Sequence, residues 1–149
     1  MTSPTPSLPR TCVIGAGSSG LPVVKALKDR NIPVVCYERT PNVGGLWCIA
    51  NKAFGASAAY DSLHINTDIR MMEYQDFPMP VDLPAYPGHS QIHQYFCDYV
   101  ERFGLAEYIR SRTEVKRCHR MADQRWEVTL GSGEREIFDA LVEIGRAHV

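Results

Sequence analysis

The chain has 149 residues, 44% of them apolar, and a net charge of −1, which suits one globular domain. This balance gives no electrostatic basis for binding nucleic acid. No segment approaches the roughly 18 consecutive apolar residues of a membrane span. The five cysteines form no C-x-x-C pair, so we expect reduced thiols in a cytoplasmic protein. The sequence indicates no oligomeric state.

The two ends of the chain differ from the rest. Residues 1–10 contain three prolines and lack the basic start and apolar run of a secretory signal, so we predict a disordered lead-in. Residues 143–149 resemble the translation of a sequencing adapter, so we expect the natural sequence to stop near Val142, with the gene cut short. The alternative is a genuine polar C-terminus.

The first 28 folded residues predict a β-strand, a helix and a second β-strand. Thr11–Ile14 and Val34–Tyr37 are short apolar runs typical of buried parallel strands. Helical spacing runs between them from about Ser18 to Arg30, with Pro22 in the first turn, where a missing N–H does no harm. The order and length are those of a βαβ unit.

The second half predicts a long helix followed by strands. Ser90 is the expected N-cap, and Gly104 is the expected end of the helix. Between them lies an apolar stripe at helical spacing, namely Ile92, Tyr95, Phe96, Tyr99, Val100 and Phe103.

After this helix, the residues of 113–120, 126–130 and 135–138 predict a small antiparallel sheet, and 139–142 predicts one more parallel strand. The predicted fold class is therefore α/β: a Rossmann-like dinucleotide-binding domain over residues 11–142, with a parallel sheet and a small antiparallel β piece. We expect this domain to be incomplete.

The turn after the first strand carries Gly15, Gly17 and Gly20 in the spacing G-x-G-x-x-G. In this setting the first glycine permits the tight turn, the second lets the backbone approach a pyrophosphate, and the third lets helix and strand pack closely. The N–H groups at the helix N-terminus face the phosphates. The motif therefore predicts a dinucleotide site, and the alternative is a glycine-rich turn without a ligand.

Glu38 ends the second strand, 18 residues after Gly20. Its carboxylate can accept hydrogen bonds from the ribose hydroxyls of an adenosine, and its negative charge would repel a 2′-phosphate. Gly44 and Gly45 follow as E-x5-G-G, a pattern similar to that of flavoproteins with two dinucleotide sites, in which FAD takes the first site. We therefore predict FAD rather than NAD, the alternative being an ordinary loop turn at the glycine pair.

Four ordered motifs resemble those of the flavin-containing monooxygenases. They are GGLW at 44–47, YDSLHINT at 60–67, MEYQDFPMP at 72–80 and FDALV at 138–142. The resemblance covers residues 11–142. The related Baeyer–Villiger enzymes carry a P-G-x-R-x-D stretch after the tryptophan, which this sequence lacks, so the resemblance favours the flavin-containing monooxygenases proper.

The resemblance implies roles for individual residues. The residues implied to bind the ADP half of FAD are Gly15, Ala16, Gly17, Ser18, Ser19, Gly20 and Glu38. Gly45, Leu46 and Trp47 are implied to contact the cofactor near its flavin end, and Asn66 and Thr67 to lie beside the isoalloxazine. Ile65 and Asn66 are implied to face the nicotinamide of NADP. The backbone of Val115 is implied to meet the adenine.

The activity implied by the resemblance is oxygenation of a soft nucleophile, an amine or a sulfide, of the N,N-dimethylaniline monooxygenase type. NADPH reduces FAD, the reduced flavin takes O2 to form a C4a-hydroperoxide, and one oxygen passes to the small-molecule substrate. Asn66 is the candidate catalytic residue, because a neutral amide can hydrogen-bond flavin or nicotinamide without giving up a proton. The alternative is that Asn66 caps a turn.

Two other interpretations stay open. The chain could belong to another flavoprotein oxidoreductase with two dinucleotide sites, although the C-x4-C of the redox-active reductases does not follow the glycine pair. It could also be a truncated FAD-binding piece without catalysis, because the second G-x-G-x-x-G and the monooxygenase signature of the family lie beyond Val142. His89 and His93 have metal-ligand spacing but lack a third ligand, so we predict no metal site.

Overall fold

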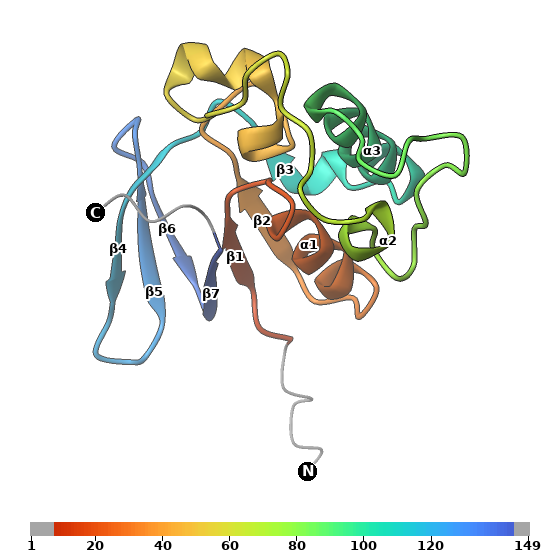
Figure 1. Cartoon of the computed structure of the whole chain (residues 1–149). Helices are drawn as coiled ribbons and strands as arrows, with labels where there is room; N and C mark the ends of the chain where they lie inside the picture. The colour runs from red at the N-terminus through yellow and green to blue at the C-terminus, as the bar shows by residue number, and fades with distance from the viewer. Residues whose placement is uncertain (1–7, 145–149) are drawn as a thin grey trace.

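The predicted βαβ unit forms the start of a parallel sheet in the computed structural model, which describes residues 8–144. Strand β1 (Thr11–Ile14) leads to helix α1 (Gly20–Lys28) and strand β2 (Val34–Tyr37). The two strands pair in parallel, as predicted. Figure 1 shows the three elements together at the red end of the chain.

The parallel sheet has four strands in the order β3-β2-β1-β7. Strand β7 (Ala140–Glu143) pairs in parallel with β1, which confirms the predicted strand near 139–142. Strand β3 (Ile109–Arg110) pairs in parallel with the end of β2 and was not predicted, because two residues are too short to show a period.

The antiparallel sheet consists of β4 (Val115–Arg120), β5 (Trp126–Leu130) and β6 (Arg135–Phe138). The prediction of three antiparallel strands is confirmed, but β4 begins two residues later than expected. The reason is that Thr113 is held elsewhere: its N–H donates to the carbonyl of Glu38 at 2.9 Å.

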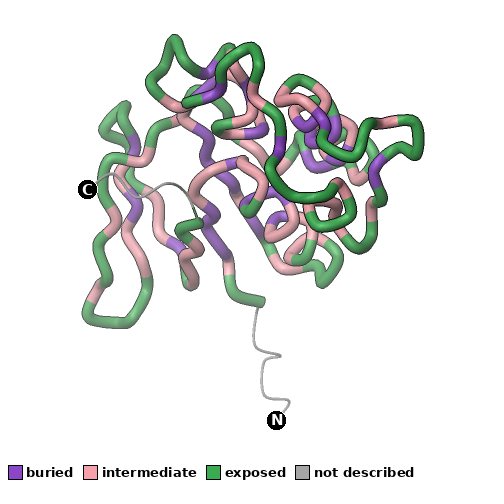
Figure 2. The backbone as a smooth tube through the Cα atoms, viewed as in Figure 1, coloured by how far each residue is buried: buried purple, intermediate pink, exposed green. Residues whose placement is uncertain are grey.

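The sheet β3-β2-β1-β7 lies between two apolar layers. Neighbouring residues of β1 point to opposite faces: Val13 joins the core with α1 and α3, whereas Cys12 joins a second core with the antiparallel sheet. Figure 1 shows α1 and α3 on one side of β1 and β2, and β4 to β6 on the other. The buried segments in Figure 2 follow these strands and the inner side of α3.

Helix α3 (His89–Arg102) carries the predicted apolar stripe, and Ile92, Tyr95, Phe96 and Tyr99 of the stripe are buried. The expectation of Ser90 as its N-cap is wrong. Gly88 is the cap, because the Gln91 side chain accepts a hydrogen bond from the Gly88 N–H at 3.0 Å. Gly104 follows the helix with a φ of 60°, as expected of a helix-ending glycine.

Short helical turns occupy the long connection between β2 and α3. They are the 3₁₀ turns η1 (Gly45–Trp47) and η2 (Ile49–Phe54) and the one-turn helix α2 (Ile69–Met72). A third turn, η3 (Ala106–Tyr108), precedes β3. Asp68 caps α2, since its side chain accepts from the N–H of Arg70 at 2.9 Å. Each turn is too short to produce a periodic signal in the sequence.

The described ends of the chain are tied to the sheets. Arg10, which the sequence analysis assigns to the lead-in, donates to the Glu136 carboxylate at 2.5 Å and to the Ile137 carbonyl at 2.9 Å. Glu143, the first residue of the expected tail, lies in β7 opposite Ile14. Residues 1–7 and 145–149 lie outside the described part. Within the described part, no helix is long and apolar enough to cross a bilayer.

Candidate functional site

The glycine loop between β1 and α1 has the close contacts that its motif predicts. Gly15 has a φ of 97°, a conformation that side-chain-bearing residues rarely adopt. A Cβ on Gly20 would lie 1.9 Å from the carbonyl oxygen of Gly15. The glycine at position 20 is therefore what lets α1 begin directly against the end of β1.

Helix α1 begins at Gly20, two residues later than the expected start at Ser18. The N–H of Leu21 donates to the Gly17 carbonyl at 3.1 Å, so helical bonding already starts at Gly17. The next bond would run from residue 22 to the Ser18 carbonyl, and Pro22 has no N–H to donate. Ser18 and Ser19 therefore lie in a turn rather than in the helix.

Glu38 is bound to the glycine loop. It is buried, with only 6% of its surface exposed. One carboxylate oxygen accepts from the Ala16 N–H at 2.9 Å, and the other accepts from the N–H and the hydroxyl of Thr40 at 2.9 and 2.8 Å. A carboxylate offers about four acceptor positions, so capacity for a ribose hydroxyl remains. Glu38 therefore fits its predicted role as an acceptor for the ribose, and its hydrogen bonds to Ala16 and Thr40 hold the carboxylate in place.

The second glycine pair contacts the first motif. The Gly44 N–H donates to the Ala16 carbonyl at 2.9 Å, and Gly44 and Gly45 have φ angles of 94° and 55°. A Cβ on Gly45 would lie 3.2 Å from the Cα of Gly17. Two stretches of bare backbone therefore meet here, and side chains would fill the space between them. This arrangement fits a ligand that backbone must approach closely, as the pyrophosphate of a dinucleotide requires.

Two side chains that were not predicted for the cofactor site bind the backbone of the second glycine pair and of the residue before it. Asn51 is fully buried, and its amide donates to the Gly45 carbonyl at 3.2 Å. His93, on α3, forms a hydrogen bond from Nε2 to the Val43 carbonyl at 3.1 Å. Burial lowers the pKa of His93 below its usual value. Neither residue belongs to a motif, and only the path of the chain brings them to the glycines.

The residues predicted to lie near the flavin are divided between buried and exposed positions. Leu46 is 45% exposed in η1, whereas Trp47 is partly buried against the main core. Ile65 is buried, and its N–H donates to the Pro87 carbonyl at 3.1 Å. Asn66 and Thr67 follow it on an exposed turn before α2. Asn66 does not cap α2, since Asp68 does. The contacts of these residues with flavin and nicotinamide stay predictions.

Val115 lies at the start of β4 opposite Leu130. Its side chain packs against the core between the two sheets. The bond from Thr113 to the Glu38 carbonyl brings this segment alongside the end of β2. The structure therefore brings Val115 to the Glu38 end of the site, and its backbone contact with adenine stays a prediction.

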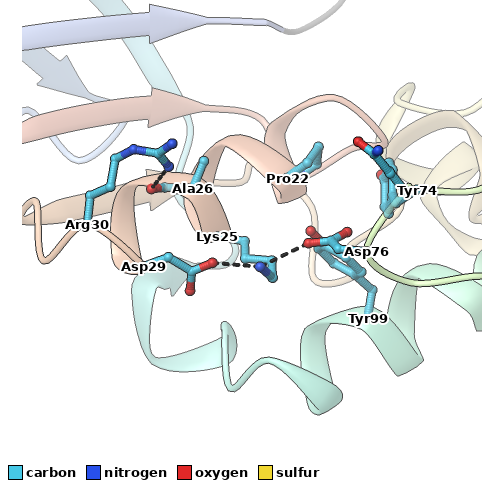
Figure 3. A pocket seen from close by; sticks show the side chains of 9 residues that line it. Pro22, Lys25, Ala26, Asp29, Arg30, Tyr74, Asp76 and Tyr99 are labelled. Carbon is cyan, nitrogen blue, oxygen red and sulfur yellow. Dashed lines mark hydrogen bonds and ion pairs between the residues drawn. The ribbon is translucent and has the colours of Figure 1, made fainter.

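Two open surface hollows are found among the described residues. One, of about 400 Å³, lies beside α1 and is lined by Pro22, Lys25 and Tyr74 among others (Figure 3). The other, of about 630 Å³, lies beside the ends of β2 and β5 and is lined by Arg39, Arg112 and Gly131 among others. Neither is lined by a residue predicted to bind the cofactor, so the chemistry of the site rests on backbone geometry rather than on either hollow.

Comparison with known proteins gives the family of the chain. A family model described as flavin-binding monooxygenase-like matches residues 9–149. Flavin-containing monooxygenase 5 of Oryctolagus cuniculus is 37% identical over 141 residues, which are 89% of this chain and 26% of that protein. Dimethylaniline monooxygenase 4 (N-oxide-forming) of Rattus norvegicus is also 37% identical over 141 residues, 89% of this chain and 25% of the relative. The chain therefore spans about a quarter of the length of these relatives.

Solved structures share the fold at lower identity. S-allyl-L-cysteine S-oxygenase from Allium sativum is 23% identical with a TM-score of 0.82, over 92% of this chain and 36% of that one. A steroid monooxygenase bound to NADP is 21% identical with a TM-score of 0.80, over 93% of this chain and 26% of that one. The predicted FAD agrees with the flavin-binding description of the family model, and the steroid monooxygenase structure holds the predicted second cofactor, NADP. With the glycine loops, Glu38 and the family match together, the chain belongs to the flavin-binding monooxygenase-like family.

Proposed function

We propose that residues 11–142 form the N-terminal, FAD-binding part of an NADPH-dependent monooxygenase. The observation that carries this proposal is the contact of the two glycine motifs through Ala16, whose carbonyl accepts from Gly44 and whose N–H donates to Glu38. The contact places two segments of bare backbone and one buried carboxylate side by side. These are the groups that the pyrophosphate and the ribose of a dinucleotide require.

Different residues of the chain would bind different parts of the cofactor. The loop from Gly15 to Gly20 and the pair Gly44 and Gly45 supply close backbone approach, and Glu38 supplies acceptors for the ribose. FAD, when bound, supplies the redox chemistry by which O2 is activated. The chain contributes position and electrostatics, while the activity belongs to the longer protein implied by the relatives.

Asn66 is the proposed catalytic residue, with Ile65 and Thr67 beside it. Its exposed side chain is available to a flavin or nicotinamide ring, and a neutral amide can donate to and accept from either ring. We expect Asn66→Ala to weaken FAD binding less than Glu38→Gln does, because the contacts to the ADP half stay intact, and to shift the visible absorption of the bound flavin. An unaltered flavin spectrum would contradict the proposed role.

The proposed substrate is a small nucleophile, oxygenated at nitrogen or sulfur. The proposal is supported by two matched proteins whose names describe N-oxide formation and S-oxygenation. A chain limited to residues 11–142 would bind FAD without completing the reaction. That outcome is the second candidate function, and the short span relative to the relatives favours it for this chain on its own.

The test is a titration of the chain with FAD and, separately, with NADP+, followed by flavin fluorescence and intrinsic tryptophan fluorescence. We expect saturable binding of FAD and much weaker binding of NADP+, because Glu38 would repel a 2′-phosphate. Folded chain that leaves FAD fluorescence unchanged would contradict the cofactor assignment. Equal affinity for the two dinucleotides would contradict the assignment of this site to FAD.

A further inference from the structure

The Ser18 carbonyl, in the glycine loop, lacks its helical hydrogen-bond donor. In an α-helix each carbonyl accepts from the N–H four residues later, and for Ser18 that residue is Pro22. A buried carbonyl without a partner is costly. The sequence therefore leaves an acceptor without its helical donor in the turn just before α1, beside the N–H groups that would face a phosphate.

Tyr74 supplies the missing donor from 56 residues further along the chain. Its hydroxyl donates a hydrogen bond to the Ser18 carbonyl. The ring is held by aromatic neighbours on α3, including Tyr99 at a centroid distance of 4.7 Å. The backbone is held as well, because the Tyr74 N–H donates to the Tyr95 hydroxyl at 2.7 Å and that hydroxyl donates to the Phe77 carbonyl at 2.6 Å.

A second link joins the same segment to α1. Asp76 forms an ion pair with Lys25 at 2.9 Å, and Lys25 also pairs with Asp29 at 2.6 Å. Figure 3 shows Lys25 between the two carboxylates, with Pro22 and Tyr74 lining the same hollow. The segment 74–76 is thus attached to the start of α1 at one point and to its middle at another.

We infer that Tyr74 is a positioning residue for the cofactor, acting through the peptide between Ser18 and Ser19. In a planar trans peptide the carbonyl and the following N–H point in opposite directions. The hydrogen bond that fixes the Ser18 carbonyl therefore also fixes the N–H of Ser19, the residue that caps the N-terminus of α1. This inference rests on the proposed function, since the Ser19 N–H serves FAD only if the loop binds its pyrophosphate.

The chemistry of Tyr74 suits this role. Burial raises the pKa of its hydroxyl well above the usual range, and the nearby Tyr95 and Tyr99 raise it further. The phenol therefore stays protonated and remains a donor at every ordinary pH. A donor on a carbonyl also polarises its peptide group, which strengthens the N–H of the same peptide as a donor to an anion.

The test compares the Kd for FAD of the chain and of Tyr74→Phe, which removes only the hydroxyl. We expect the Kd to rise roughly three- to tenfold, the loss of one hydrogen bond. Tyr99→Phe is the matched control, because it removes a hydroxyl from the same aromatic cluster. Among the described residues, the Tyr99 hydroxyl donates no hydrogen bond, so the Kd of this variant should stay that of the unmodified chain.

The rescue variant is Pro22→Ala combined with Tyr74→Phe. Replacing the proline restores an N–H at position 22 that can donate to Ser18 within the helix, so the double variant should regain most of the lost affinity. If Tyr74 acted only through packing, the double variant would not regain FAD affinity, because the alanine at position 22 adds no contact with the ring. Equal Kd values for the chain and Tyr74→Phe would overturn the inference, and so would an unrescued double variant.

A measurement without FAD separates this inference from the proposed function. Without FAD, amide hydrogen exchange in the first turn of α1 should be faster in Tyr74→Phe than in the unmodified chain. It should slow again in the double variant. If the free chain shows this pattern but binds no FAD, the proposed function fails while the local contact stands. If FAD binds and neither exchange nor Kd changes, the inference alone fails.

Discussion

Ala16 and Gly44 are joined by a 2.9 Å hydrogen bond from the Gly44 N–H to the Ala16 carbonyl. The Ala16 N–H is used as well, since it donates to Glu38. One residue therefore connects the glycine loop, the acidic residue that ends β2 and the second glycine pair. The two glycine motifs and the acidic residue therefore belong to a single structural unit, so we expect a substitution in one of them to change the geometry of the others.

The first prediction concerns Gly45→Ala. Gly45 has a φ of 55°, and a Cβ there would lie 3.2 Å from Gly17. The control is Gly55→Ala, which has a φ of 64° and, apart from its chain neighbours, no atom of residues 8–144 within 4 Å of the new Cβ. Both should lose about 1–2 kcal/mol of stability from the left-handed backbone, measured by urea denaturation. Only Gly45→Ala should also weaken FAD binding, and equal Kd values for the two variants would contradict this.

The second prediction contrasts two glycines of one motif. A Cβ on Gly20 would lie 1.9 Å from the backbone of Gly15, whereas a Cβ on Gly17 finds its nearest neighbour at 3.8 Å. Gly20→Ala should therefore lower stability by about 1–3 kcal/mol, as overpacking does. Gly17→Ala should keep its melting temperature and lose FAD affinity, because the methyl group occupies the space of the pyrophosphate. The prediction fails if the two variants melt alike.

The third prediction concerns Glu38→Gln. The carboxylate accepts from Ala16 on one oxygen and from Thr40 on the other, and the NH2 of glutamine would face one of these donors. We expect a loss of about 1–3 kcal/mol in the free energy of unfolding, together with weaker FAD binding. Glu134→Gln, on an exposed turn, is the control. Retained stability and affinity in Glu38→Gln would show that the bonds to Glu38 are dispensable.

The fourth prediction concerns acid stability through Glu136, which accepts from Arg10 and Tyr37 at 2.5 Å each and from Arg110 at 2.7 Å. Burial acts to raise the pKa of Glu136, but the bonds from Tyr37 and Arg10 outweigh it, and the pKa lies below its ordinary value of 4.5. A carboxyl with a lowered pKa stabilises the fold above the unfolded-state pKa, and this contribution disappears as the pH falls through the folded-state pKa.

Urea unfolding of the chain between pH 3 and pH 7 tests this sign. We expect stability to fall below about pH 4.5, and Glu136→Gln to be less stable at pH 7 and less sensitive to acid. Glu127→Gln, whose partner Arg135 is at 3.6 Å on the same sheet, is the control and should follow the unmodified chain. If the free energy of unfolding falls with pH as steeply in Glu136→Gln as in the unmodified chain, the acid sensitivity comes from other groups.

Some features could be predicted because they depend on neighbouring residues. The stripe of α3 and the alternation along β5 span enough residues to show a period, and the strands of the βαβ unit are uninterrupted apolar runs. The predicted start of α1 at Ser18 is wrong because Pro22 has no N–H to donate to the Ser18 carbonyl, so the helix begins at Gly20. Strand β3, with two residues, and helix α2, with about one helical turn, are too short to show the repeat of their own structure.

The sequence by itself determined the chemistry of the site: glycines where backbone must turn or approach a ligand, and an acid at the end of β2. These requirements are local, so their spacing could be read directly. Only the tertiary structure decided which distant groups meet, namely Gly44 with Ala16, Asn51 with Gly45, and Tyr74 with Ser18. Such hydrogen bonds depend on the path of the whole chain, because a donor is chosen by its position in space and not by its distance along the sequence.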